Sequence, residues 1–221
     1  MHHGHMSRTA VLVAVLAVGA MTGSGCIVGS STEPGSATGR SASAEPVDRP
    51  FEGNQLRINL SAGKYVIRGT PDRRIRVNWS TRDPLDGRKV RVGVEASGSR
   101  GRIDVNGPSN GFAVEMTLPS RCDLRLELTA GDLLLTGIEG HKDVHVNAGD
   151  VKIGIQKATA YRSVSTFVMA GDISADPFGG SKGGLFRRFS WSGTGSYDLR
   201  ARLLAGDLTL DYDATLAADL Q

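Results

Sequence analysis

The sequence contains few aromatic residues and very little cysteine. Of its 221 residues, 12 are Phe, Tyr or Trp and two are Cys. Two cysteines cannot form a disulfide scaffold or a Cys-rich zinc site, and no apolar run reaches the ~20 residues that span a bilayer. These absences exclude a multi-pass membrane protein, a coiled coil and a disulfide mini-protein. Hydrophobic residues make up 39% of the chain, which is enough for one buried core.

The amino end has the composition of a targeting segment. Arg8 precedes an uncharged apolar stretch from Ala10 to Met21, which predicts a secretory signal peptide over residues 1–25. Small residues before Cys26 resemble a bacterial lipobox, so we expect a lipid on Cys26 that anchors the exported protein to a membrane, at the periplasm or the cell surface. The alternative is a secreted protein without a lipid.

The next segment differs in composition from both of its neighbours. Residues 26–50 consist mainly of Ser, Gly, Thr, Ala, Pro and Glu, and such a segment cannot bury enough apolar surface to offset the entropy of ordering it. We therefore predict a flexible tether over residues 26–50 and one folded domain over residues 51–221.

Apolar residues in this domain recur with a period of two. Leu56, Ile58 and Leu60 alternate with polar residues, and the same alternation recurs over residues 74–79, 90–94 and 112–118. This period is typical of strands with one face on a core. Because no stretch has a helical period, the fold class is predicted to be all-β.

A short motif, Ala-Gly-Asp, interrupts these alternations again and again. At each copy the apolar series resumes one residue out of step, which requires a bulge or corner that turns the strand. Glycine supplies the unusual φ, and Asp can cap free N–H groups of the turn. The four copies and a degenerate fifth are Ala130-Gly131-Asp132, Ala148-Gly149-Asp150, Ala170-Gly171-Asp172, Ala205-Gly206-Asp207 and Ala62-Gly63-Lys64.

The spacing of the copies suggests how the strands stack. They recur after 18, 22 and 35 residues, and a spacing near 20 suits one rung of a β-solenoid. We therefore predict a single β-solenoid, or β-helix-like, domain built from Ala-Gly-Asp corners. The alternative is a twisted antiparallel β-sandwich, because residues 71–118 have the pattern of hairpins.

These corners also carry a family resemblance. Strand, Ala-Gly-Asp and strand in repetition, preceded by Met116-Thr117-Leu118-Pro119 and continued by the segment 184–195, resemble the bacterial "putative adhesin" β-strand-repeat family. The resemblance covers residues 51–213. It implies a β-solenoid-like domain outside the cytoplasm, in an envelope-associated family of unknown molecular function, and it supplies no catalytic residues.

Two sets of residues are candidates for metal binding. His141, Asp143 and His145 project from one face of a strand and could hold Zn²⁺, but outward polar residues need no such role. The corner residues Asp132, Asp150, Asp172 and Asp207 could form a Ca²⁺ ladder, but their uneven spacing favours turn capping. We therefore expect neither a metal nor another cofactor.

Basic residues concentrate in the first part of the domain. Residues 57–104 contain 12 basic and 5 acidic side chains, and a basic face could contact anionic envelope groups. Its alternative role is to keep the domain soluble. Nucleic acid is disfavoured because few aromatics are available for stacking. The residues predicted for such a face are Arg74, Arg76, Lys89, Arg91 and Arg102.

Together these features predict a function without catalysis. We expect a cell-envelope lipoprotein that acts as a surface, adhesin-like binding or structural module. Its partners are the membrane, through the lipid, and either an anionic envelope polymer or another envelope protein. The alternative is a carbohydrate- or metal-dependent enzyme on a β-helix, which is an analogy from fold alone.

Overall fold

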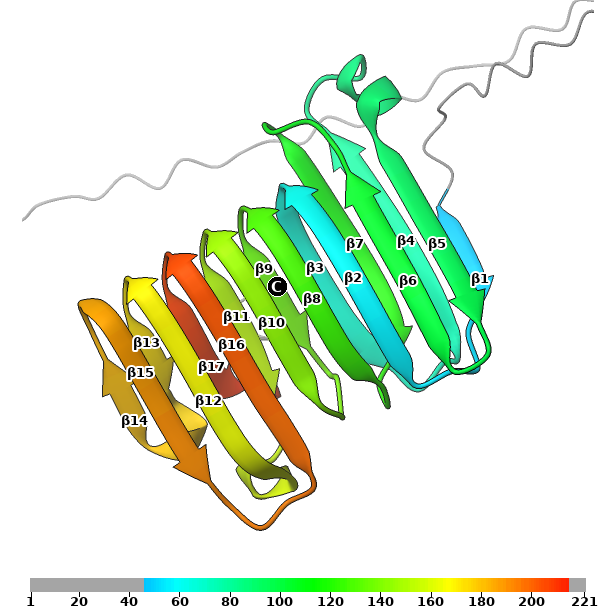
Figure 1. The fold of residues 1–221 in the computed structure, drawn as a ribbon. Coiled ribbons are helices and arrows are strands. Elements are labelled where there is room, and N and C mark those ends of the chain that lie inside the picture. The colour runs from blue at the N-terminus through cyan, green and yellow to red at the C-terminus, as the bar shows by residue number, and fades with distance from the viewer. Residues whose placement is uncertain (1–45, 215–221) are drawn as a thin grey trace, which may run out of the picture. The chain divides into compact units, whose positions relative to one another are not determined.

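The computed structural model describes residues 46–214, which form two mixed β-sheets (Figure 1). The predicted signal peptide and Cys26 lie outside the described residues. The eight-stranded sheet has the order β15 (Leu185–Ser192), β12 (Tyr161–Ala170), β16 (Tyr197–Ala205), β10 (Lys142–Ala148), β8 (Asp123–Ala130), β2 (Gln55–Ala62), β6 (Arg100–Asn106) and β5 (Arg91–Ser97).

The second sheet lies behind the first in Figure 1 and has nine strands. Between the strands of residues 46–214 lie three short 3₁₀ helices, η1 (Asp86–Lys89), η2 (Ala158–Ala160) and η3 (Asp176–Phe178). No helix within residues 46–214 is long and apolar enough to cross a membrane. The order of this sheet is β1 (Val47–Pro50), β4 (Arg74–Thr81), β7 (Phe112–Pro119), β3 (Lys64–Thr70), β9 (Leu133–Thr136), β11 (Val151–Ile155), β17 (Leu208–Tyr212), β13 (Ile173–Ala175) and β14 (Gly180–Lys182).

The core lies between the two sheets. Strand residues alternate between the core and solvent, so in β8 Leu124, Leu126 and Leu128 are buried while Arg125 is exposed. The inward residues of both sheets belong to one hydrophobic cluster. The alternation read from the sequence is therefore the alternation that builds the core, and the fold is all-β, as predicted.

Each corner carries the chain from the eight-stranded sheet to the nine-stranded one. The chain passes from β2 to β3, β8 to β9, β10 to β11, β12 to β13 and β16 to β17 in this way, so each corner is the bend of a two-strand arch. The central glycine is at φ 115° in Gly131, 126° in Gly149, 137° in Gly171 and 121° in Gly206. These values lie where side chains other than glycine are strained. Gly63 is not among the positive-φ glycines.

The corners are stacked closely on one another. A Cβ on Gly131 would lie 1.8 Å from the carbonyl oxygen of Gly63, and one on Gly149 would lie 2.0 Å from that of Gly131. Backbone hydrogen bonds join the stack, for example from the Gly131 N–H to the Ala148 oxygen at 2.8 Å. Glycine is required at these corners both by its φ and by the lack of space.

The predicted solenoid is wrong. In a solenoid the rungs stack in chain order, whereas here the last arch, β16–β17, lies between β10–β11 and β12–β13. Strands at the sheet margins are antiparallel to their neighbours, as β5 is to β6 and β15 is to β12. The two sheets instead form a sandwich-like fold. It differs from the antiparallel sandwich of the alternative because its central pairs, such as β8 with β10, are parallel.

The first strand begins inside the range predicted as tether. Val47 to Pro50 form β1, which pairs antiparallel with β4, with Val47 opposite Val77. Pro50 is tolerated there because β1 is an edge strand. The ordered domain thus starts a few residues earlier than the composition indicated.

Candidate functional site: an arginine row on the eight-stranded sheet

Four arginines lie in one line across the outer face of the eight-stranded sheet. The register pairs Arg57 of β2 with Arg102 of β6 and with Arg125 of β8. Asp143 of β10 pairs with Arg125 and also with Arg200 of β16. We call Arg102, Arg57, Arg125 and Arg200 the arginine row. Neighbouring strands are about 4.8 Å apart, so Arg102, Arg57 and Arg125 follow one another at this spacing, and Asp143 separates Arg125 from Arg200.

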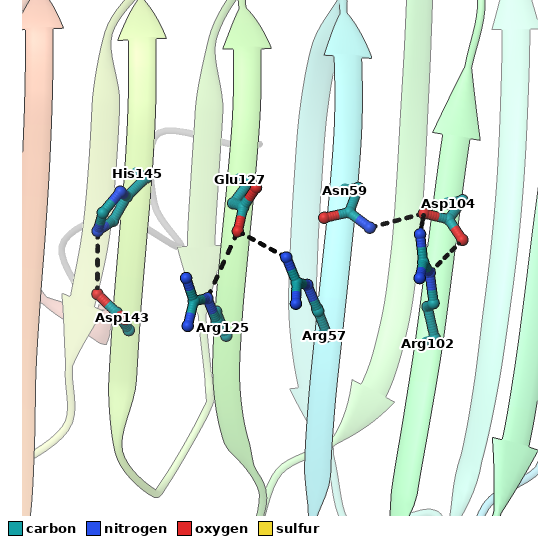
Figure 2. A network of polar contacts seen from close by, with 8 residues as sticks. All are labelled: Arg57, Asn59, Arg102, Asp104, Arg125, Glu127, Asp143 and His145. Atoms are coloured by element: carbon teal, nitrogen blue, oxygen red, sulfur yellow. Dashed lines mark hydrogen bonds and ion pairs between the residues drawn. The ribbon is translucent and has the colours of Figure 1, made fainter.

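Carboxylates on the same face offset part of this charge (Figure 2). Glu127 lies between two arginines, with its Oε1 3.1 Å from Arg57 Nη2 and 3.4 Å from Arg125 Nε. Arg102 Nε donates to Asp104 Oδ2 at 2.7 Å, and this bond holds the pKa of Asp104 below its ordinary value. Like charges directly opposite one another are unfavourable in a sheet. The carboxylates of Glu127 and Asp104 reduce this repulsion between the neighbouring arginines.

The row lines a shallow depression of about 620 Å³. Its lining carries five arginines against four carboxylates, and it extends from β5 to β16. No hydrogen bond or ion pair joins Arg200 to any other of the residues 46–214. Side chains of Arg57, Arg102 and Arg125 are each about half exposed, at 51%, 55% and 54%. The depression therefore offers accessible guanidinium groups with donors that their own ion pairs do not use.

This arrangement is chemically suited to binding anions. A guanidinium group has five N–H donors and stays charged at all physiological pH values. It binds carboxylate, phosphate or sulfate groups in a bidentate manner. Because guanidinium does not exchange protons at neutral pH, the row fits recognition better than acid–base chemistry.

Of the five basic residues predicted for a basic face, only Arg102 belongs to the row. Arg74 and Arg76 lie on β4 in the other sheet, where both contact Asp48, at 2.7 and 3.5 Å. Lys89 ends η1 and contacts Asp86 at 2.7 Å. Arg91 begins β5 and donates to the Arg88 carbonyl oxygen. The structure therefore does not gather these five residues on one surface.

The sequence analysis missed the other three members of the row. Arg57, Arg125 and Arg200 each stand five residues before the alanine of a corner, and Asp143 has the same position before Ala148. Aligning the repeats on their corners would have placed these side chains in one line. The signal was therefore present in the sequence.

The three candidate zinc ligands do not converge on one point. His145 Nε2 lies 3.3 Å from Asp143 Oδ1, beside the row (Figure 2). His141 turns to another strand, where its Nδ1 accepts the Asp198 N–H at 3.0 Å. Among residues 46–214, no group of three or more His, Cys, Asp and Glu side chains is arranged to hold a metal ion.

Three of the four corner aspartates, Asp150, Asp172 and Asp207 but not Asp132, accept backbone N–H groups of neighbouring turns within the described residues. Asp150 Oδ1 accepts the Asp207 N–H at 3.0 Å, and Asp207 Oδ1 accepts the Asp172 N–H at 2.8 Å. Asp172 Oδ1 in turn accepts the Gly184 N–H at 3.1 Å. Each of these carboxylates thus links one arch to the next along the stack.

Sequence and structure comparisons add little to this description. No family model matches the sequence, and no curated protein matches it. One similar structure is titled "putative cell adhesion protein" from Clostridium sporogenes; it is 14% identical, covers 75% of this chain and 98% of its own, and has a TM-score of 0.44. Another, a "putative adhesin" from Bacteroides fragilis, is 9% identical over 77% and 99%, with a TM-score of 0.23. Both TM-scores are below 0.5, so the proposed function depends on residues of this chain.

Proposed function

We propose that this protein is a non-catalytic module of the cell envelope that binds an anionic polymer across the arginine row. The observation that carries the proposal is the line of four arginines in one depression, with Arg200 unpaired among the described residues. A polymer with an acidic group on successive units would meet several guanidinium groups at once, and such multivalent contact strengthens binding beyond any single pair.

The predicted anchor places such a module at the envelope. A lipid on Cys26 and a tether that leads to Val47 would hold the domain at a membrane surface. About 20 residues separate Cys26 from Val47, so a flexible tether of this length would let the domain reach polymer about 25 Å away. We propose this location together with the binding function.

Binding to a model polyanion tests the function. Titration calorimetry of the full chain with polygalacturonate should show binding that weakens as salt is raised, and dextran should show none. The double variant Arg57→Gln/Arg200→Gln should bind about tenfold more weakly. The matched control is Arg68→Gln, a half-exposed arginine on the nine-stranded sheet, which should bind like the wild type. Equal loss in both variants, or equal binding of dextran, would contradict the proposal.

A conservative variant tests how the row binds. Arg125→Lys keeps the positive charge but removes the planar pair of donors. If recognition is bidentate, Arg125→Lys should bind measurably more weakly than the wild type. Unchanged affinity would mean that the row acts only through its net charge.

A further inference from the structure

A second surface exposes apolar side chains at the margin of the eight-stranded sheet, next to the Arg200 end of the arginine row. Val168 pairs with Arg187 and Ala170 with Leu185, so Phe186 of β15 lies beside Met169 of β12. On the other side of β12 the register likewise places Leu204 beside Met169. Large apolar side chains this exposed are unusual together. Their exposed fractions are 68% for Phe186, 65% for Leu185, 48% for Leu204 and 37% for Met169.

Phe186 is held in this position at an energetic cost. Its φ is +53°, the only positive value among the non-glycine residues of the described chain. A bulky aromatic residue is strained at positive φ. The chain before it is fixed, because the Gly184 N–H donates to Asp172 Oδ1 at 3.1 Å and the Gly184 oxygen accepts the Gly171 N–H at 3.3 Å. The corner stack therefore presents an aromatic ring to solvent in a conformation that its own backbone disfavours.

The segment that contains Phe186 carries basic but no acidic side chains, although the Asp172 carboxylate lies beside it at the Gly184 N–H. Residues 177–197 contain three basic side chains and no acidic one. In the next row of the sheet Phe167 lies between Arg188 and Arg202, and the Arg188 guanidinium lies 5.2 Å from the Phe167 ring centre. We call Phe186, Met169 and Leu204, with Arg188 and Arg202, the apolar–basic tip; Leu185 and Arg187 are opposite Ala170 and Val168 and so occupy positions of the other face at the same edge.

We propose that the apolar–basic tip docks on an anionic lipid surface. Aromatic and aliphatic side chains that enter the headgroup region, beside arginines that contact lipid phosphates, are the combination that binds proteins to such surfaces.

A second copy of the chain fits less well, because a two-fold contact would set the basic residues of one tip against those of the other. A second alternative is that the arginines only protect the edge strand β15 from pairing with another chain. That role would not require the exposed apolar side chains of Leu185 and Phe186 on the same strand. The tip shares no residue with the arginine row, although Arg202 lies two residues from Arg200 on β16, so the variants below are chosen to distinguish the two proposals.

A fluorescence experiment on the full chain locates the contact. In vesicles of phosphatidylglycerol and brominated phosphatidylcholine, the bromine atoms quench a tryptophan that enters the bilayer. Phe186→Trp should lose about half of its added emission on binding. The matched control is Leu85→Trp, because Leu85 is 66% exposed but lies between β4 and η1, away from the tip. Equal quenching of the two variants, or none in either, would overturn the proposal. Residues 1–45 are the same in every variant, so differences report the domain.

Charge variants separate this site from the arginine row. Arg188→Gln/Arg202→Gln should reduce binding to phosphatidylglycerol vesicles about tenfold, and the remaining binding should depend less on salt. Arg57→Gln/Arg102→Gln, on β2 and β6, should bind vesicles like the wild type. A loss in the second variant but not in the first would overturn the proposal.

The strain at Phe186 supplies a further readout. Phe186→Asn should raise the midpoint of thermal unfolding by about 2 °C, because Asn accepts positive φ, while vesicle quenching of a tryptophan placed at Met169 is lost. Persistence of that quenching would contradict a role for Phe186 in docking. A dimer in the wild type that Phe186→Asn abolishes, seen by sedimentation velocity without lipid, would replace the lipid surface by a second copy.

Discussion

The ammonium group of Lys142 donates a hydrogen bond of 2.7 Å to the hydroxyl group of Tyr161 in the interior of the domain. Lys142 occupies an inward position of β10, in line with Val144, and it is only 2% exposed. Its register partners on both sides are leucines, Leu124 and Leu199. A lysine thus replaces the apolar residue that this layer of the core has in the neighbouring arches.

Burial of Lys142 makes stability depend on pH. Burial lowers the pKa of Lys142 to about 8, although Asp213, Cys122 and Glu139 favour the charged form. Below pH 8 the folded protein bears the full cost of a buried ammonium. Between pH 8 and about 10.5 the unfolded chain binds more protons than the folded one, so this group makes stability rise with pH. Above pH 9 the raised pKa of Cys122, about 12, acts in the opposite direction, because the thiol ionises first in the unfolded chain.

Lys142→Met should remove this dependence. At pH 7 the variant should be about 2 kcal/mol more stable than the wild type, because an apolar side chain replaces a buried charge. The difference between the two proteins should shrink by about 1 kcal/mol from pH 8 to pH 9, since Cys122 is common to both. Urea unfolding at pH 7, 8 and 9 measures both quantities. A difference that stays constant with pH would show that folded Lys142 keeps its proton throughout this pH range, so that its pKa is not lowered by burial.

The corner glycines should not tolerate even a methyl group. Gly149→Ala combines a φ of +126° with a Cβ 2.0 Å from the Gly131 oxygen, so we expect a loss of about 3 kcal/mol or more in the free energy of unfolding. Gly93→Ala is the control, because nothing lies within 4 Å of its Cβ and its φ is not positive. That variant should change stability by no more than ~0.5 kcal/mol. Similar values for both would show that the corners are not closely stacked.

The corner carboxylates should act as hydrogen-bond acceptors. Asp207→Ala leaves the Asp172 N–H without its partner and should cost about 1 kcal/mol. Asp207→Asn keeps a side-chain oxygen at this position and should cost less. Adding Ca²⁺ during thermal unfolding should move the wild type and Asp207→Asn by the same amount. Selective stabilisation of the wild type by Ca²⁺ would restore the metal-ladder hypothesis.

The predicted lipid on Cys26 has a direct chemical test. Cys26→Ser should release the protein from the salt-washed membrane fraction of its host, because the lipid is the predicted covalent attachment and salt weakens the contact proposed for the tip. Mass spectrometry of the mature amino terminus should find a lipid-modified cysteine in the wild type. Finding cleavage near residue 44 instead would support the secreted alternative.

The sequence predicts the strands and corners of this fold better than their order. Alternation places Leu124 and Leu126 in the core, and the Ala-Gly-Asp copies mark the points where the chain changes sheet. The order of the strands in the sheets could not be predicted in this way. The four Ala-Gly-Asp corners share one backbone geometry, so Ala148 can pair with the alanine of any other such corner. In the structure its partners are Ala130 and Ala205. Nothing local to a corner specifies those neighbours; the packing of side chains from distant segments does.

The same limit applies to the candidate site. The predicted basic residues came from one stretch of high charge, and the structure distributes Arg74 and Arg102 over different sheets. The other members of the arginine row stand 23 to 98 residues from Arg102 in the sequence. They become neighbours only because the sheet places their strands side by side. The number of residues between a side chain and its corner alanine predicts how far along the strand it lies. Which side chains become neighbours depends on the order of the arches in the sheets.

The place of β16–β17 in the sheets has a consequence for how the chain folds. During synthesis the arch β12–β13 is complete before β16 and β17 exist, and the open side of β10–β11 is then free to receive it. Both arches end their first strand in the same Ala-Gly-Asp, so Ala170 can occupy the site beside Ala148 that Ala205 takes in the finished protein. The final arch must separate these two or arrive before they join. β16 and β17 therefore have to insert between strands that are already present in each sheet. If β12–β13 pairs with β10–β11 first, that pairing is a kinetic trap until β16–β17 displaces it.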